Sequence, residues 1–414
     1  MSNIKPFICV RPAEDKVDKI AALPYDVYNR AEAKAVVTAN PQSFLAIDRA
    51  ETQFGDEVDT YDERVYAKAH EMLSDWIDNG SFVRDTQNAY YIYELTMDGR
   101  VQTGIVACAS IDDYANNIIK KHENTRADKE ADRIHHVDTC SAQTGPIFLA
   151  YRNNPIIGEV VAAVKQTPAL YDFVADDGIR HRVFKIGDAT QIEAIQNAFA
   201  GIDDIYIADG HHRCASAVKV ALKRRKEHPD YEGTEEFNYF MSVLFADNEL
   251  KIMDYNRLIL DAKGQDHDSI LAFIRQKCDV EGSFAEPVRP EKKGQFGMYD
   301  NTGWYRLTIR KEYKSDDAVE GLDVSILQRE ILQPLFAIED PKTDLGIDFV
   351  GGIRGLHELE RRVNEDAKVA FSMYPTSIQE LFSVADQGKL MPPKSTWFEP
   401  KLRSGIFIHR IERL

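Results

Sequence analysis

The amino-acid sequence predicts a mixed α/β protein with two domains. Short runs of β-branched and aromatic residues, typical of strands, alternate along the chain with stretches of helical hydrophobic spacing. Turn residues separate them, and there is no internal repeat or low-complexity tract. A chain of 414 residues is long enough for two or three domains. Since the pattern changes after Pro229 and the acidic stretch 232–236, we expect domains at 1–230 and 231–414.

Hydrophobic spacing and turn signals define the expected elements of the first domain. The strongest helix is 63–78, which is amphipathic, and Met97-Asp98-Gly99-Arg100 is a hairpin turn between two strands. A long segment, 152–200, precedes the next functional motif. We expect strands at 4–10, 90–96, 101–109 and 147–151, and helices at 31–38, 63–78, 128–136, 157–165 and 190–200.

The second domain shows the same alternation. Turns at 246–249 and 300–303 each lie between two strand-like runs, which predicts hairpins over 240–255 and 296–309. We also expect helices at 324–332, 356–364 and 378–385, and strands at 369–373 and 406–408.

Composition restricts the class of protein. The net charge of −17 argues against binding to DNA or RNA, which requires a basic surface. No apolar stretch reaches the roughly 20 residues needed to cross a bilayer, and the first residues lack a signal core, so we expect a cytoplasmic protein with no membrane partner. The five cysteines include no CxxC pair, which indicates reduced thiols. No residue pattern indicates an oligomeric state.

The most informative segment is Ile205–Val218. It begins as a buried strand, breaks at Asp209-Gly210 and continues as an alanine- and valine-rich helix. A strand followed by a glycine turn and a helix leaves backbone N–H groups directed at one point, which is an anion site by geometry. His211, His212 and Arg213 add donors suited to phosphate oxygens. The alternative is a surface turn that happens to contain histidines.

Four blocks of the sequence carry a family resemblance. They are Pro24-Tyr25-Asp26-Val27, His122-Glu123-Asn124-Thr125, Asp209–Arg213 and the tail Met391-Pro392-Pro393-Lys394-Ser395-Thr396-Trp397-Phe398-Glu399-Pro400-Lys401. Over nearly its whole length the chain resembles DUF family 1015, a large prokaryotic family of domains of unknown function. The Asp209–Arg213 loop also resembles the phosphate-binding corner of the ParB/sulfiredoxin superfamily, and within it the SerK-type free-serine kinases. The resemblance implies a ParB/sulfiredoxin-like N-terminal half with a second mixed α/β C-terminal domain that contributes to the substrate cleft.

The resemblance also implies an activity. It indicates a kinase that transfers a phosphoryl group from ATP or ADP to the hydroxyl of free L-serine, or of a similar small molecule, giving O-phosphoserine. In such kinases a glutamate after the first strand is the general base, and Glu123 stands at that position, with Glu130 or Asp132 as a second acid. A carboxylate that only caps a helix is the structural alternative for Glu123.

Each remaining site residue has an expected role. Asp209 would bind Mg²⁺, and His212 would act at the transferred phosphate. In the tail, Lys394, Ser395 and Thr396 would bind the substrate in a cleft that also contains the Asp209–Arg213 loop. An equally good interpretation is that the tail is only a solvated loop held by its two aromatic residues. The residues expected to hold nucleotide phosphates are Gly210, His211, His212, Arg213 and Lys121.

Two other classes of function remain as alternatives. His122, His135, His136, His211 and His212 would serve a metal-dependent hydrolase, although the HExxH spacing is absent. A nucleotide-binding switch or partitioning-type protein is the other alternative, but no basic helix pair for DNA stands out. The glycine-rich segment 345–355 lacks the P-loop spacing. We therefore rank kinase activity first.

Overall fold

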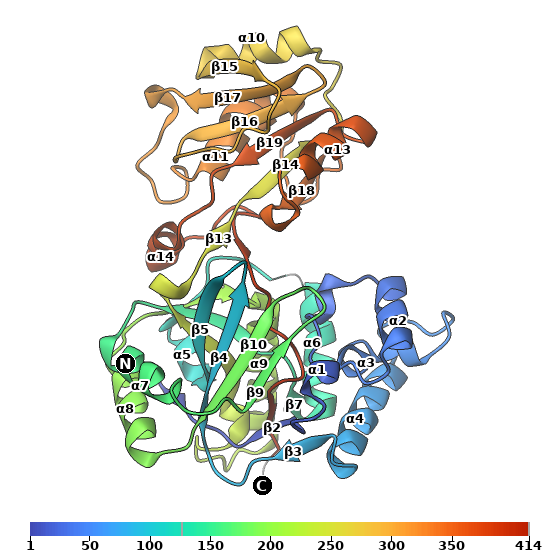
Figure 1. The fold of residues 1–414 in the computed structure, drawn as a ribbon, viewed down its shortest axis with the longest axis vertical. Coiled ribbons are helices and arrows are strands. Elements are labelled where there is room, and N and C mark those ends of the chain that lie inside the picture. Colours follow the sequence, from blue (N-terminus) through green and yellow to red (C-terminus); the bar gives the residue numbers. More distant parts are fainter. Residues whose placement is uncertain (126, 413–414) are drawn as a thin grey trace. The chain divides into compact units, whose positions relative to one another are not determined.

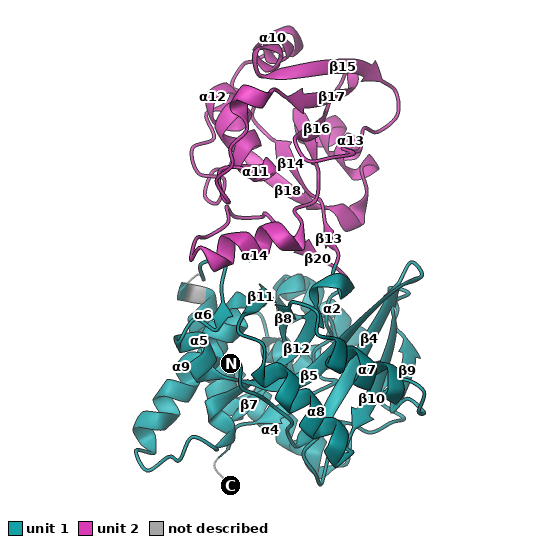
Figure 2. Ribbon diagram, turned by 90° about the vertical axis from the view of Figure 1, so that its left-hand side faces the viewer, with its two compact units in different colours: residues 1–250, 400–414 teal, residues 251–399 magenta. Residues whose placement is uncertain are grey.

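The computed structural model describes residues 1–125 and 127–412. The chain forms two compact units, Met1–Leu250 with Pro400–Leu414 and Lys251–Glu399, which Figure 2 colours separately. Both units combine helices with sheets, so the predicted mixed α/β class is confirmed. Among the described residues, no helix has the length and apolar character required to cross a membrane.

A large mixed sheet forms the centre of the first unit (Figure 1). The pairs β6–β11 and β8–β12 are parallel, and the other neighbours are antiparallel. β1 (Ile4–Lys5) pairs with β5 off the main path. In order across the sheet, the strands are β6 (Ile119–Lys120), β11 (Ile205–Asp209), β8 (Ile147–Tyr151), β12 (Tyr239–Ala246), β5 (Arg100–Ser110), β4 (Tyr90–Met97), β10 (Arg180–Ile186) and β9 (Tyr171–Val174).

Helices bury the apolar side chains of this sheet. Ile157 of α7, Phe199 of α8 and Cys214 of α9 belong to the same buried cluster as the strand residues Ile105, Leu149 and Ile207. These helices and their neighbours are α5 (Ile111–Ala115), α6 (Ala127–Cys140), α7 (Pro155–Val164), α8 (Ala189–Ala200) and α9 (His211–Glu227).

A smaller sheet of the first unit has the order β3–β2–β21–β7. It packs with α2, α3 and α4 in a separate core that includes Val10, Phe44, Leu73 and Ile408. Because β21 follows the second unit in sequence, the chain returns to the first unit at its end. The elements are β2 (Cys9–Pro12), α1 (Val17–Ile20), α2 (Arg30–Ala39), α3 (Leu45–Asp48), α4 (Glu63–Asp78), β3 (Phe82–Arg84), β7 (Ala142–Gln143) and β21 (Ile408–Arg410).

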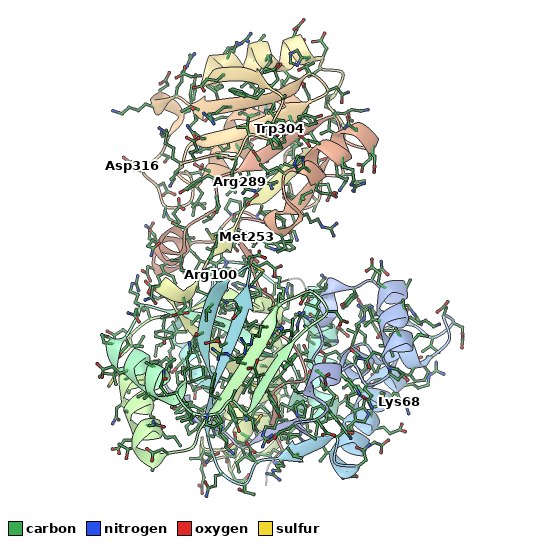
Figure 3. All side chains as sticks on the ribbon, in the orientation of Figure 1. Lys68, Arg100, Met253, Arg289, Trp304 and Asp316 are labelled. Atoms are coloured by element: carbon green, nitrogen blue, oxygen red, sulfur yellow. The ribbon has the colours of Figure 1, made fainter. Side chains whose placement is uncertain are left out.

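The second unit is built on an antiparallel sheet with the order β15–β17–β16–β19–β14–β18. Trp304 of β17, marked in Figure 3, is fully buried in its core. Its strands are β13 (Ile252–Met253), β14 (Tyr255–Ile259), β15 (Cys278–Phe284), β16 (Gln295–Asp300), β17 (Gly303–Ile309), β18 (Ile347–Gly351), β19 (Val369–Met373) and β20 (Trp397–Phe398). Its helices are α10 (His267–Lys277), α11 (Asp323–Leu327), α12 (Gln333–Phe336), α13 (His357–Glu365) and α14 (Ile378–Asp386).

Several predicted elements are confirmed. The helix over 63–78 is α4, with Asp62 as its N-cap, and the turn at 97–100 joins β4 to β5. The turn at 300–303 joins β16 to β17. The segment 152–200 adds α7, α8 and the β9–β10 hairpin, and it extends the large sheet beyond β4.

The hairpin predicted over 240–255 is wrong. β12 pairs with β5 and β8 in the first unit, whereas β13 pairs with β20 and β14 pairs with β18 and β19 in the second. The apolar run of β12 is fully buried because it lies inside a sheet, and local alternation does not reveal which strands it joins. The boundary expected near residue 230 accordingly lies within the first unit, which extends to Leu250.

Candidate functional site

Two parallel strands place the two main sequence motifs at one edge of the large sheet. β6 pairs with β11, with Ile119 opposite Ile205 and Lys120 opposite Tyr206. Each strand is followed by a loop and a helix, so residues 121–125 and 209–213 lie at the carboxyl ends of neighbouring parallel strands. This is where ligands bind in open α/β sheets. We call these two segments the loop cluster.

Gly210 makes the turn between β11 and α9 possible. It adopts the left-handed conformation, with φ 89°, at the N-cap position of α9. Its amide donates to Asp209 Oδ1 at 2.8 Å. The Arg213 guanidinium lies over Gly210, where an added Cβ would stand 3.1 Å from Arg213 Nε, and its Nη1 donates to the Pro146 carbonyl. The predicted strand, glycine turn and helix are confirmed.

His122 and His211 form a buried pair between the two loops. Their rings meet edge to face with centroids 4.6 Å apart, and they are 0% and 7% exposed. Burial lowers the pKa of His122 to about 4 and the pKa of His211 well below its ordinary value, so both rings are neutral near pH 7. Among the described residues, neither His122 nitrogen nor His211 Nε2 has a hydrogen-bond partner. The structure thus brings the His122-Glu123-Asn124-Thr125 block and the Asp209–Arg213 block into contact.

Asp209 is held ionised at the base of the loop. Although burial alone would raise its pKa, the charges of Lys401 and Arg213 hold the pKa well below its usual range. Lys401 Nζ lies 3.2 Å from Asp209 Oδ2. Lys401 belongs to the tail motif, which is the only signal in the sequence that could have indicated it.

The carboxylates expected around the acceptor differ in their surroundings. Glu123 is 35% exposed, and its Oε1 lies 3.9 Å from His122 Nε2. Glu130 is buried, accepts a hydrogen bond from Thr125 Oγ1 at 2.7 Å and pairs with Lys219. Asp132 accepts hydrogen bonds from Tyr66 and Arg133. Glu130 and Asp132 are therefore engaged in structural contacts.

The expected phosphate ligands occupy different positions around the loop. His212 and Arg213 are half-buried, whereas His211 faces the interior. Lys120 pairs with Asp204 at 2.8 Å. Lys121 is exposed, and its charge lowers the pKa of His211 after the larger effects of burial and His122. Lys121 is therefore better placed than Lys120 to meet a ligand at the loop.

The expected substrate residues lie in the second unit. Ser395 is buried, and its hydroxyl donates to the Pro392 carbonyl at 2.6 Å. Lys394 is exposed, and its Nζ lies 5.6 Å from the centre of the Tyr255 ring. Thr396 is half-buried. The tail motif is therefore divided, because Lys394, Ser395 and Thr396 belong to one unit and Lys401 to the other.

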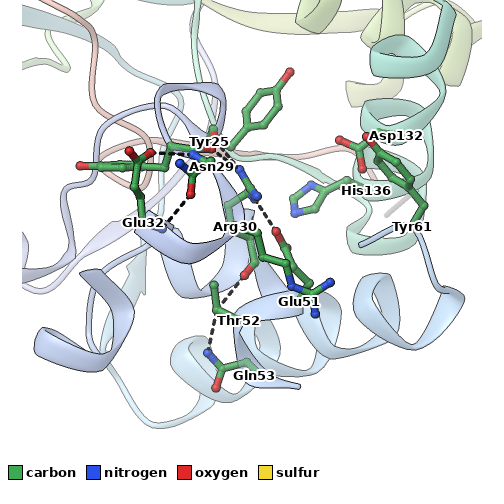
Figure 4. Close-up of polar contacts among 12 residues, drawn as sticks. Tyr25, Asn29, Arg30, Glu32, Glu51, Thr52, Gln53, Tyr61, Asp132 and His136 are labelled. Carbon is green, nitrogen blue, oxygen red and sulfur yellow. Dashed lines mark hydrogen bonds and ion pairs between the residues drawn. The ribbon is translucent and has the colours of Figure 1, made fainter. Parts of the chain in front are cut away.

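A cavity that sequence reasoning missed lies in the first unit near the Pro-Tyr-Asp-Val block. Its volume is about 170 Å³, and it shares four lining residues with a smaller cavity of about 30 Å³ that is also lined by Arg213. The shared residues are Tyr25, Asp48, Arg133 and His136. We call the larger one the Tyr25 cavity; Figure 4 shows Asp132 and His136 on α6, and Tyr25 and Glu51 across from them. The spacing of Lys129, Asp132, Arg133 and His136 on one helical face is the signal that could have found it.

The histidines do not gather around a common point. Within the described residues, no group of three or more His, Cys, Asp or Glu side chains is arranged to hold a metal ion. His135 is half-exposed beside Tyr66 and Glu63. His136 contacts the Ile47 carbonyl instead. No observation therefore favours the hydrolase alternative.

The sequence and fold together define a mixed α/β protein with a candidate anion-binding loop. The chain belongs to the family described as "Protein of unknown function (DUF1015)", whose model matches residues 4–325, so the predicted family resemblance is confirmed. No curated protein matches the chain.

Solved structures with detectable similarity are distant. A free serine kinase in complex with AMP is 13% identical, with 73% of this chain and 91% of that chain covered and a TM-score of 0.34. SbnI with C-terminal truncation, from Staphylococcus aureus, is 10% identical, with 71% and 82% covered and a TM-score of 0.37. A conserved hypothetical protein from Pyrococcus furiosus is 15% identical, with 74% and 95% covered and a TM-score of 0.32. At this level of similarity, function has to be argued from the residues of this chain.

Proposed function

We propose that the first unit transfers a phosphoryl group from ATP or ADP to the hydroxyl of a small molecule, with free L-serine as the leading acceptor and O-phosphoserine as its product. The observation that supports this proposal is the parallel pairing of β6 and β11. It puts a half-exposed carboxylate, Glu123, and a helix N-terminus with basic side chains at the same edge of the sheet. A ParB/sulfiredoxin-like character of this unit is part of the same proposal.

The phosphates would bind at the start of α9. The first N–H groups of a helix have no partner within the helix, and the helix dipole favours an anion there. His212 and Arg213 are half-buried beside these groups, and Lys121 is exposed nearby. His211 is neutral and buried, so its role would be to hold the loop against His122 and not to neutralise phosphate charge.

The chemical step needs a base for the acceptor hydroxyl. The hydroxyl oxygen forms the new bond to phosphorus, its proton passes to the Glu123 carboxylate, and the nucleotide leaves as ADP from ATP or as AMP from ADP. His212 at the transferred group would stabilise the charge that moves to the phosphate oxygens. The proton leaves Glu123 to water after the product departs.

A magnesium ion could be held at this site by Asp209, whose two carboxylate oxygens already have partners. Asp209 is ionised, but its Oδ1 accepts from Gly210 and its Oδ2 pairs with Lys401. Mg²⁺ binds through one or two carboxylates and keeps several waters, so Asp209 would hold a nucleotide-bound Mg²⁺ alongside Lys401 or through water. When bound, the ion would neutralise phosphate charge.

The direct test is a turnover assay with the full chain. ATP or ADP with Mg²⁺ is offered with L-serine, L-threonine, glycerol or ethanolamine, and products are identified by mass spectrometry. We expect one phosphorylated acceptor in amounts equal to the ADP or AMP released. Release of phosphate without a phosphorylated acceptor would assign hydrolysis instead. An absence of nucleotide binding would overturn the proposal for the loop.

A further inference from the structure

The Tyr25 cavity is lined by one face of α6 and by the segments across from it. Lys129, Asp132, Arg133 and His136 recur at three- and four-residue spacing, so they share a face of the helix. Ile134 of this helix packs against a separate cluster that includes Phe237, and so does Val137, which also lines the smaller cavity. The polar face is thus left to line the cavity.

The guanidinium groups of the cavity are already neutralised. Arg133 donates through Nε to Asp132 Oδ2 at 2.9 Å, and its guanidinium lies 3.9 Å from the centre of the Tyr25 ring. Arg49 donates through Nε to Glu51 Oε1 at 2.5 Å and through Nη1 to the carbonyl oxygens of Tyr25 and Tyr28. Neither arginine is therefore placed to receive an anion in the cavity.

The remaining charge of the lining is negative. Asp48 is 4% exposed, and its Oδ1 accepts from Thr144 Oγ1 at 2.8 Å. Asp26 is exposed at the rim, as is Lys129. When His136 is counted as neutral, the lining contains four carboxylates and three cations. The carboxylates are Asp26, Asp48, Glu51 and Asp132, and the cations are Arg49, Lys129 and Arg133.

His136 supplies an unused acceptor atom. The ring is 3% exposed, and burial and the charge of Arg133 lower its pKa, so it is neutral. Its Nε2 lies 3.3 Å from the Ile47 carbonyl oxygen, which requires the proton on Nε2 and leaves Nδ1 as an acceptor. Within the described part of the chain, this buried Nδ1 has no hydrogen-bond partner. A buried polar atom of this kind needs a donor.

We propose that the Tyr25 cavity binds the ammonium group of a small hydroxyl compound. An ammonium group brings three N–H donors and a positive charge, which match the His136 acceptor and the negative lining around Asp48. The tyrosine rings of the lining add aromatic faces, against which cations bind favourably. The binding of the ammonium group in this cavity is independent of the proposed function. Only the further step, that the bound compound is the phosphoryl acceptor, rests on the proposed function.

The test measures binding by calorimetry without nucleotide, so its failure is distinct from a failure of phosphoryl transfer. Ethanolamine, ethylene glycol and glycolate have nearly the same size and differ in charge. We expect ethanolamine to bind at least about tenfold more tightly than ethylene glycol, and glycolate to bind more weakly still. Equal affinity for ethanolamine and ethylene glycol would overturn the proposal.

Variants locate the site. We expect Asp48→Asn to lower ethanolamine affinity by about tenfold or more, because it removes a buried charge. Asp26 is exposed, so Asp26→Asn should preserve the fold and lower the affinity about threefold. Asp18→Asn, at an exposed position of α1, is the matched control and should change nothing. Unchanged affinity in Asp26→Asn and Asp48→Asn together would exclude this cavity.

Discussion

The loop cluster and the Tyr25 cavity belong to the same unit but are built in different ways. The loop cluster depends on backbone geometry, a left-handed glycine and a helix N-terminus, and Lys121, His212 and Arg213 add donors beside the half-exposed Glu123 carboxylate. The cavity depends on side chains from several elements; its lining has more carboxylates than cations, and among the described residues the buried His136 Nδ1 has no hydrogen-bond partner. The loop cluster therefore suits an anion, and the cavity suits a cation.

This difference makes the two regions separable by experiment. A change in the loop cluster should alter nucleotide binding or the chemical step and leave ethanolamine binding intact. A change in the cavity should do the reverse. Arg213 is an exception to this separation, because it belongs to the loop cluster and also lines the smaller cavity beside Tyr25.

The largest effect is expected from Glu123→Gln. The amide keeps the size and shape of the side chain but does not accept a proton at neutral pH, so the loss falls on the chemical step. We expect kcat to drop by roughly 10²–10⁴-fold, as is typical for a positioned general base, with nucleotide and ethanolamine affinities nearly unchanged. Steady-state kinetics and calorimetry together check this.

The matched control is Glu193→Gln, at an exposed position of α8, which should retain normal turnover. If Glu123→Gln also retains normal turnover, Glu123 is not the base. Asp26 then becomes the better candidate, since Glu130 is engaged by Thr125 and Lys219. That result would move the chemical step from the loop cluster towards the Tyr25 cavity.

The loop cluster could be predicted from sequence because its residues are contiguous. Ile205–Arg213 carries the strand, the glycine and the basic side chains in one run, and all three fall where expected. Predicting the contact of His122 with His211 would have required the knowledge that β6 and β11 are neighbours. Strand β6 has only two residues and gives no periodic signal of its own.

The Tyr25 cavity could not be predicted because its lining is discontinuous. Tyr25, Asp48 and His136 come from a short 3-10 turn, from α3 and from α6, and only packing joins them. The tail motif shows the same limitation. Its contiguous residues suggested one site, but Lys394 and Lys401 belong to different units.

The next largest effect concerns the pH dependence of stability. His122 is fully buried with its pKa lowered to about 4, whereas in the unfolded chain it titrates near 6.5. Between these values the unfolded chain binds a proton that the folded chain does not, so the free energy of unfolding falls as the pH falls. For His122 the loss is about 3 kcal/mol between pH 6.5 and 4, and His211 acts in the same direction.

The measurement is urea unfolding at pH 7 and at pH 4.5. We expect His122→Gln to lose less stability over this interval than the unaltered chain, because the amide does not titrate. His135→Gln, at an exposed position, should follow the unaltered chain. If all three proteins lose the same free energy of unfolding between pH 7 and pH 4.5, His122 is not held neutral in the fold.

Gly210→Ala should separate backbone strain from loss of the anion site. The left-handed φ of 89° costs an alanine roughly 1–2 kcal/mol, and the added Cβ would crowd Arg213 Nε at 3.1 Å. Gly178→Ala is the matched control, since its φ is 79° and nothing lies within 4 Å of an added Cβ. Both variants should lose stability in urea unfolding, Gly210→Ala by somewhat more because of Arg213, but only Gly210→Ala should weaken nucleotide binding. If Gly210→Ala and Gly178→Ala bind the nucleotide with equal affinity, the loop at Gly210 does not bind the phosphates.

The smallest effect is expected from Arg213→Lys. Lysine keeps the positive charge but cannot donate from a planar fork to phosphate and to the Pro146 carbonyl at once, so nucleotide affinity should fall about tenfold. Arg225→Lys is the control, because Arg225 makes a similar forked contact with Asp112 away from the loop. Ethanolamine affinity is the second readout, since Arg213 also lines the smaller cavity. If Arg213→Lys weakens ethanolamine and nucleotide equally, the two regions bind one ligand together and the separation between them fails.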